Sequence, residues 1–246
     1  MPSWPADGAL DRPWSGARER FATWYERESQ TTNYDLFLRL PALAFFGSVG
    51  FVQFHALVEV FANAQGLATP ALASAIAART MSFLVVVVFA TLTLVRSKAV
   101  GRSKGLWPRA AALLGSSAGF AFTFTARAEP SVAWDVASAM FAATGALLTV
   151  AVVLRLGRSF STMPEARRLV TEGAYKIVRH PLYAVEEIAL IGVFLQFRSL
   201  PAALILLVHL AFQIERMRNE EKVLAASFPE YADYAQRTAR LVPGVY

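Results

Sequence analysis

The sequence predicts an all-α fold, a polytopic integral membrane bundle of five to six transmembrane helices that includes a C-terminal helical hairpin. Hydrophobic residues make up 55% of the 246 residues and charged residues only 17%, and the mean hydropathy is +0.41. A soluble domain carries about 25% charged residues. Several apolar stretches approach the roughly 20 residues that a helix needs to cross a bilayer, and basic residues gather between them.

The N-terminal segment, residues 1–35, is expected to be cytoplasmic. It mixes acidic and basic residues and lacks the continuous apolar core of a cleaved signal peptide. Trp14, Phe21 and Trp24 recur at near-helical spacing. This pattern is compatible with a helix lying in the membrane interface and equally with a disordered tail.

Residues 36–154 are expected to form a transmembrane region of four helices. The predicted spans cover about residues 36–62, 71–95, 108–126 and 131–154. The third span contains Gly115 and Gly119, small residues that allow neighbouring helices to approach closely.

Two shorter apolar runs follow, at about residues 182–197 and 200–214. Arg198, Ser199 and Pro201 separate them, so the chain must turn tightly between the two runs. The sequence therefore predicts an antiparallel hairpin that either crosses the membrane or enters it part way.

The distribution of basic residues predicts the orientation. Arginines and lysines cluster after the second span and after the fourth, and the alternate loops are nearly uncharged. Such clusters lie on the cytoplasmic side. Both termini should then be cytoplasmic if the hairpin crosses, and the Ala- and Arg-rich composition is typical of a bacterial inner-membrane protein.

Composition also argues against several kinds of site. The chain has no cysteine and three scattered histidines, so no set of ligands with metal spacing exists and we expect no metal. The net charge of +6 is spread over short loops rather than gathered on one soluble face, which argues against nucleic acid. His209, inside the hairpin, is expected to be satisfied within the helical bundle.

The segment before the hairpin contains Arg179, His180 and Pro181. Proline favours the first turn of a helix, because its missing N–H would lack a partner there in any case. The helix that follows thus begins with free backbone N–H groups, which attract a carboxylate or phosphate.

The segment after the hairpin contains Arg216, Glu220 and Glu221. Arg216 and Glu220 share one helix face, and Glu221 is turned about 100° away and can serve a second partner. An antiparallel hairpin returns this cluster to the membrane face that carries Arg179 and Tyr183. An anion-binding helix end beside a carboxylate pair suits a zwitterionic small molecule at the membrane surface.

Together these residues resemble the isoprenylcysteine carboxyl methyltransferase family, whose wider superfamily includes phospholipid methyltransferases and sterol-type reductases. The resemblance covers about residues 153–246, and residues 155–246 would form the catalytic region. It rests on Gly173-Ala-Tyr175, Arg179-His180-Pro181-Leu182-Tyr183, Arg216, Glu220-Glu221 and the ending from Phe228 to Tyr246.

The resemblance implies an S-adenosyl-L-methionine-dependent methyltransferase that acts on a lipophilic acceptor from the bilayer. Arg216 would orient the acceptor and Glu220 would hold the cofactor or the arginine. The cofactor-binding residues that the resemblance implies are Gly173, Tyr175, Arg179, His180, Pro181, Tyr183, Glu220 and Glu221. The acceptor group stays open among a carboxylate, an amine, a phenol and a thiol.

Three residues depart from the family pattern. Val185 stands where many relatives have glycine, and Glu186 and Glu187 place two acids in an otherwise apolar helix. They complement the helix dipole and are equally compatible with an acceptor pocket for a cationic or amine group.

Two other functions stay open. One is an NADPH-dependent lipid or sterol reductase, which is disfavoured because few basic residues beyond Arg167 and Arg168 are present for a 2′-phosphate. The other is a membrane scaffold or transport component with a degenerate site, which ionisable residues inside the spans favour weakly.

Overall fold

The computed structural model describes residue 20 and residues 32–37, 39–62 and 70–244. The chain divides into two units, residues 1–39 and 40–246, which we describe separately. In the first unit, helix α2 (Thr32–Phe37) carries Asp35, which forms an ion pair of 2.7 Å with Arg39. The expected interfacial helix around Trp14 and Phe21 lies outside the described residues.

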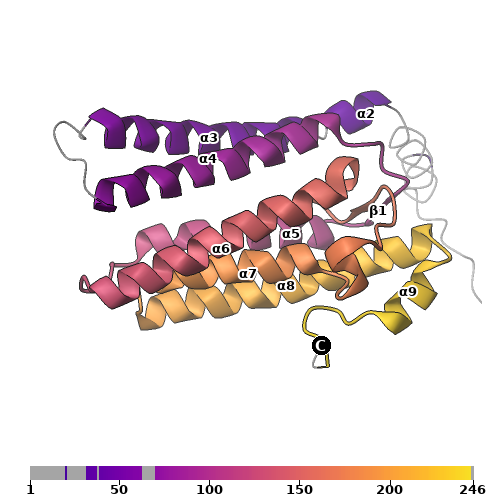
Figure 1. Ribbon diagram of the computed structural model, residues 1–246. Helices are drawn as coiled ribbons and strands as arrows, with labels where there is room; N and C mark the ends of the chain where they lie inside the picture. The colour runs from indigo at the N-terminus through magenta and orange to yellow at the C-terminus, as the bar shows by residue number, and fades with distance from the viewer. Residues whose placement is uncertain (1–19, 21–31, 38, 63–69, 245–246) are drawn as a thin grey trace, which may run out of the picture. The chain divides into compact units, whose positions relative to one another are not determined.

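The second unit consists of helices joined by short loops (Figure 1). Its α-helices are α3 (Arg39–Ala62), α4 (Pro70–Val95), α5 (Trp107–Ser117), α6 (Val132–Leu156), α7 (Pro181–Phe194), α8 (Leu200–Ser227) and α9 (Tyr231–Arg237). Short 3-10 helices are η1 (Ala118–Phe124), η2 (Gly157–Ser159) and η3 (Gly173–Lys176). The prediction of a polytopic helical membrane protein is confirmed.

Length and composition identify the helices that can cross a membrane. Among the described residues, three stretches qualify: Asp35–Ala62, Val132–Ser159 and Leu200–Ser227. A shorter apolar stretch, Arg79–Val95, belongs to α4. Helices α7 and α8 form the predicted hairpin, but α8 continues without a break to Ser227, well past the end of its apolar part.

The predicted third span is a composite of two elements. Helix α5 ends at Ser117 and continues as the 3-10 helix η1. Ser117 and Thr123 each bond a backbone carbonyl of the preceding turn through their hydroxyl groups. Such bonds compete with the regular helical ladder, and together with Gly119 they explain why the α-helix does not persist over the whole stretch.

Helices α6 and α7 pack closely because small residues line their contact. A Cβ atom on Gly145 would lie 2.4 Å from the backbone nitrogen of Ala189, and one on Gly192 would lie 2.6 Å from that of Ala142. The Ser138 hydroxyl donates a hydrogen bond of 2.7 Å to the Gly192 carbonyl across the contact. This pattern is typical of helix association in membranes, where close packing and interhelical hydrogen bonds replace the hydrophobic effect.

A two-stranded ribbon connects the loops at one end of the bundle. Strand β1 (Gly101–Arg102) pairs antiparallel with β2 (Glu165–Ala166). The buried Glu165 lies 3.2 Å from Arg102, 2.5 Å from Arg167 and 3.9 Å from Arg96. Arg96 and Arg102, two of the basic residues after the second predicted span, therefore hold the α4–α5 loop against the segment before α7.

Candidate functional site

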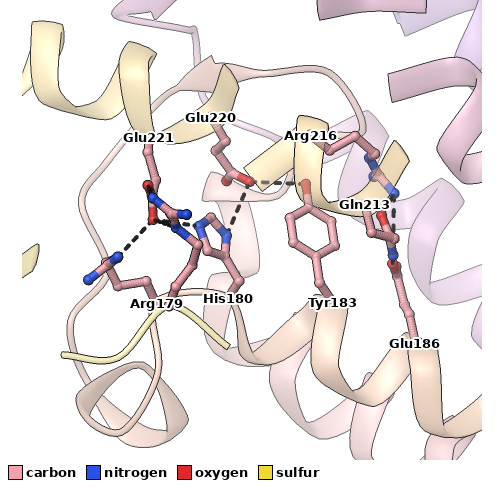
Figure 2. A network of polar contacts seen from close by, with 9 residues as sticks. Arg179, His180, Tyr183, Glu186, Gln213, Arg216, Glu220 and Glu221 are labelled. Atoms are coloured by element: carbon pink, nitrogen blue, oxygen red, sulfur yellow. Dashed lines mark hydrogen bonds and ion pairs between the residues drawn. The ribbon is translucent and has the colours of Figure 1, made fainter. Parts of the chain in front are cut away.

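The structure brings the two predicted polar stretches together (Figure 2). The stretch of residues 173–183 contributes η3 and the start of α7, and the stretch of residues 216–221 lies on the extension of α8. Because α8 continues past its apolar part, its acidic residues stand opposite the first turn of α7 rather than on a loop.

Glu221 is in contact with two arginines and a histidine. Its Oε1 accepts a hydrogen bond of 2.8 Å from Arg179 Nε and lies 3.2 Å from His180 Nε2. Arg240 Nη2 donates to its Oε2 at 2.8 Å. Arg179 also donates to the carbonyls of Ala235 and Thr238, so this cluster ties the C-terminal tail to the hairpin.

The backbone reinforces the same attachment. The N–H groups of Arg179 and His180 donate to the carbonyls of Ala239 and Arg240, at 2.8 and 3.1 Å. Helix α7 therefore begins beside a strand-like piece of the tail. Its first internal bond is from Ala184 N–H to the His180 carbonyl, so the N–H groups of Leu182 and Tyr183 have no partner within the helix.

Glu220 is the more open of the two carboxylates. Its side chain is 33% exposed, against 14% for Glu221. It accepts a hydrogen bond of 3.0 Å from the Tyr183 hydroxyl and lies 3.7 Å from Nδ1 of the buried His180. The His180 and Tyr183 rings stack at 5.4 Å, which holds both side chains toward Glu220 (Figure 2).

Arg216 lies on the other side of Tyr183. Its guanidinium carbon is 4.7 Å from the centre of the Tyr183 ring, a cation–π arrangement. Its Nη1 donates to the side-chain carbonyl of Gln213 at 2.6 Å and lies 3.9 Å from Glu186. Arg216 is thus directed toward the hairpin, although its spacing from Glu220 would also allow an ion pair along one helix face.

Gly173 and Tyr175 shape the loop before α7. Gly173 has a φ of +62°, in the left-handed region that favours glycine, and it starts η3. Tyr175 is buried by this turn, and its carbonyl accepts a hydrogen bond of 2.8 Å from the Tyr234 hydroxyl. The loop is therefore attached to α9 as well as to the hairpin.

A cavity of about 460 Å³, open solvent included, lies between these elements. Its apolar and aromatic walls include Leu156, Leu224, Tyr175, Tyr231 and Tyr234, and its charged walls are Glu165, Glu220, Arg167, Arg168 and Arg179. Binding sites for small molecules mix apolar and aromatic walls with a few polar groups, as this lining does. Glu220 lies in this wall, and Glu221 is turned toward the tail.

Tyr231 and Tyr234 are site residues that sequence reasoning did not single out, although both lie in the C-terminal stretch that carries the family resemblance. The buried Tyr231 hydroxyl has no hydrogen-bond partner among the described residues. Burial raises the pKa of the Tyr231 phenol and raises that of Tyr234 to about 12. Both phenols therefore stay protonated near neutral pH and can donate a hydrogen bond.

Acidic and basic side chains continue from this site into the hairpin. Gln213 Nε2 donates to Glu186 at 3.1 Å, and His209 Nε2 lies 2.8 Å from Glu187. In the described part of the chain, no group of three or more histidine, aspartate and glutamate residues is arranged to hold a metal ion.

Comparison with known proteins locates the similarity in the same region. Residues 137–226 match the model of the isoprenylcysteine carboxyl methyltransferase family. The chain is 37% identical over 76 residues to the cobalt-zinc-cadmium resistance protein CzcN of Cupriavidus metallidurans, covering 30% of this chain and 35% of that protein. It is 35% identical over 108 residues to protein-S-isoprenylcysteine O-methyltransferase B of Arabidopsis thaliana, covering 41% of this chain and 55% of that protein.

A solved structure shares the fold over most of the chain. It is that of the eukaryotic intramembrane Ras methyltransferase, an isoprenylcysteine carboxyl methyltransferase, with a TM-score of 0.52 and 19% sequence identity. The match covers 93% of this chain and 92% of that one. The resemblance noted from the sequence is thus confirmed, and the chain spans about a third to a half of the length of the curated relatives named above.

Proposed function

Because residues 137–226 match the model of the isoprenylcysteine carboxyl methyltransferase family, we propose that this protein is a membrane methyltransferase. It transfers a methyl group from S-adenosyl-L-methionine to a lipophilic acceptor that arrives through the bilayer. The observation that carries the proposal is the partly exposed carboxylate of Glu220 beside the start of α7. It lies in the wall of the cavity that Tyr175, Tyr231 and Tyr234 also line.

Residues in and beside the cavity fit two charged groups of the donor, its sulfonium and its carboxylate. A sulfonium cation is stabilised by a carboxylate such as Glu220 and by aromatic faces such as Tyr175. The donor's carboxylate is suited to the free N–H groups of Leu182 and Tyr183 at the start of α7. The unpartnered Tyr231 hydroxyl supplies a further hydrogen bond to a bound polar ligand.

The other site residues keep this arrangement in place. The cation cluster around Glu221 holds α7, α8 and the tail together, and His180 supports Tyr183 by stacking. The donor supplies an electrophilic methyl group on a good leaving group, so the protein has to position the acceptor and exclude water. In this proposal Arg216, whose guanidinium lies against the Tyr183 ring, orients that acceptor.

Calorimetry in detergent tests the donor site. We expect wild type to bind both S-adenosylmethionine and S-adenosylhomocysteine, and His180→Ala to weaken both. Glu220→Gln should weaken the sulfonium form by about tenfold or more and the neutral thioether form far less, because the lost interaction is electrostatic.

The matched control is Glu215→Gln, the same change on α8 at a residue that contacts Trp107 instead of the cavity. It should leave both affinities unchanged. Equal losses for the two ligands in Glu220→Gln would contradict the assigned role of Glu220. Binding of NADPH by wild type without any affinity for either adenosyl compound would replace the methyltransferase proposal with the reductase.

A further inference from the structure

Five polar side chains line the contact between α7 and α8, from Tyr183 toward the turn of the hairpin. We call them the hairpin seam: Glu186, Glu187, His209, Gln213 and Arg216. They lie in a part of the chain that is otherwise apolar. Ionisable groups within the apolar helices of a membrane protein are costly, and they commonly mark a substrate or ion path.

The hairpin seam is connected to the donor site by successive contacts. The Tyr183 hydroxyl donates to Glu220, and the Tyr183 ring lies under Arg216. Arg216 donates to Gln213, which in turn donates to Glu186 (Figure 2). A group bound beside Glu186 would therefore lie next to the side chains that border the methyl donor.

Several polar atoms of the hairpin seam are buried without a hydrogen bond. Neither carboxylate oxygen of Glu187 makes a hydrogen bond with the described residues. His209 Nε2 is 2.8 Å from one of them but without hydrogen-bond alignment, and its Nδ1 is also unpartnered. His209 is 7% exposed. Because a carboxylate can only accept hydrogen bonds, a ligand that bonds Glu187 must bring N–H or O–H donors.

The charge of the hairpin seam favours the same kind of ligand. It holds two carboxylates against one permanent cation, Arg216, with His209 as the one other member that can become positive. Glu186 and Gln213 already occupy one side of the Arg216 guanidinium. A carboxylate acceptor would add a third negative charge at low dielectric, whereas an ammonium group balances the second one.

We infer that the acceptor is a lipophilic amine whose headgroup is bound by the carboxylates of Glu186 and Glu187. The inference rests on the proposed function and specifies its substrate class. Glu186 is the nearer of the two to the donor site along the contacts above, and its side chain is 27% exposed, so a ligand can reach it. It takes the proton that an ammonium group must lose before its nitrogen can react.

The step balances in atoms and charge. The ammonium gives one proton to the Glu186 carboxylate and becomes a neutral amine. The nitrogen lone pair then forms the new N–C bond while the C–S bond of the donor breaks, and that bonding pair stays on sulfur as a neutral thioether. The methylated nitrogen carries the positive charge that the sulfonium had.

A matched pair of probes tests the inference without the donor. S-farnesylcysteamine carries an amine, and 3-(farnesylthio)propanoate carries a carboxylate on nearly the same skeleton. We expect wild type in nanodiscs to bind the amine at least about tenfold more tightly than the carboxylate. Glu186→Gln and Glu187→Gln should each reduce that preference, and Glu215→Gln should leave it unchanged.

The linkage of the product gives a second readout that does not depend on any variant. With isotopically labelled donor, wild type should label the amine probe in an alkali-stable N-methyl group. Label in an alkali-labile methyl ester of the carboxylate probe, or tighter binding of that probe, would overturn the inference while leaving the methyltransferase proposal intact. Failure of wild type to bind the donor would overturn both.

Discussion

The hydroxyl of Tyr231 is buried in the cavity wall and has no hydrogen-bond partner among the described residues. An unsatisfied buried polar group costs about 1–3 kcal/mol, so its removal should not lower the stability of the free protein. We expect Tyr231→Phe to keep or slightly raise the melting temperature in detergent and to weaken donor binding several-fold.

Tyr234→Phe is the matched control for that substitution. The Tyr234 hydroxyl donates to the Tyr175 carbonyl, so its loss should lower the free energy of unfolding by about 1 kcal/mol. If Tyr231→Phe destabilised the free protein as much as Tyr234→Phe, while donor affinity stayed the same, the Tyr231 hydroxyl would have a structural role and no ligand contact.

Helix periodicity predicts part of the site and leaves the rest to the tertiary structure. It places Glu220 and Glu221 on different sides of one helix, and the two residues do serve different partners, Tyr183 and the Arg179 cluster. Periodicity says nothing of Arg240 or Tyr231, because their positions depend on how the tail folds back. Those contacts are made between residues far apart on the chain, which no local pattern specifies.

Among the helices, the α6–α7 contact depends on Gly145. A Cβ atom there would lie 2.4 Å from the Ala189 nitrogen and 2.6 Å from its Cα, and backbone cannot move aside as a flexible side chain can. Alanine normally stabilises a helix relative to glycine by about 0.5–1 kcal/mol. We nevertheless expect Gly145→Ala to lower the melting temperature, since overpacking costs about 1–3 kcal/mol.

Gly47→Ala on α3 is the control, because a Cβ atom at Gly47 meets nothing within 4 Å. This variant should melt at or above the wild-type temperature. Equal melting temperatures for the two variants would mean that α6 and α7 are not in close contact in the membrane. Gly145 also illustrates a limit of sequence reading: small residues are recognisable in every span, but which of them face a neighbour depends on how the helices are paired.

The element boundaries show which sequence signals are decisive. Apolar length predicts α3, α4 and α6 within a few residues, because a span must match the bilayer. It does not reveal that α8 continues to Ser227, since a helix beyond the bilayer needs no apolar stretch. The change from α5 to η1 is likewise hidden, because it depends on hydroxyl–carbonyl bonds inside an apolar run.

In the second unit, the loops gather in two groups, one at each end of helix α6. At one end, the α4–α5 loop, the segment before α7 and the end of α8 lie together: Ser97 N–H donates to the Arg158 carbonyl, and Gly101 is packed against Ser227. At the other end, Ala128 N–H donates to the Gln196 carbonyl, and Arg198 donates to the Glu129 carbonyl. The hairpin turn therefore reaches the loop at which α6 begins.

These two ends predict a testable topology. Helix α6 has 25 residues and is about 37 Å long, enough to cross a bilayer, and the hairpin turn meets its first end. Because the other end carries the arginine-rich loops, we expect that end and the C-terminus to be cytoplasmic and the hairpin to cross fully.

The chain has no cysteine, so single substitutions can be labelled without background. In intact cells a membrane-impermeant maleimide should label Glu129→Cys and Ser199→Cys, and it should label Lys104→Cys and Lys222→Cys only after the membrane is opened. Labelling of Glu129→Cys without Ser199→Cys would mean that the hairpin enters the membrane only part way. The reverse pattern for all four variants would mean that the protein has the opposite orientation in the membrane.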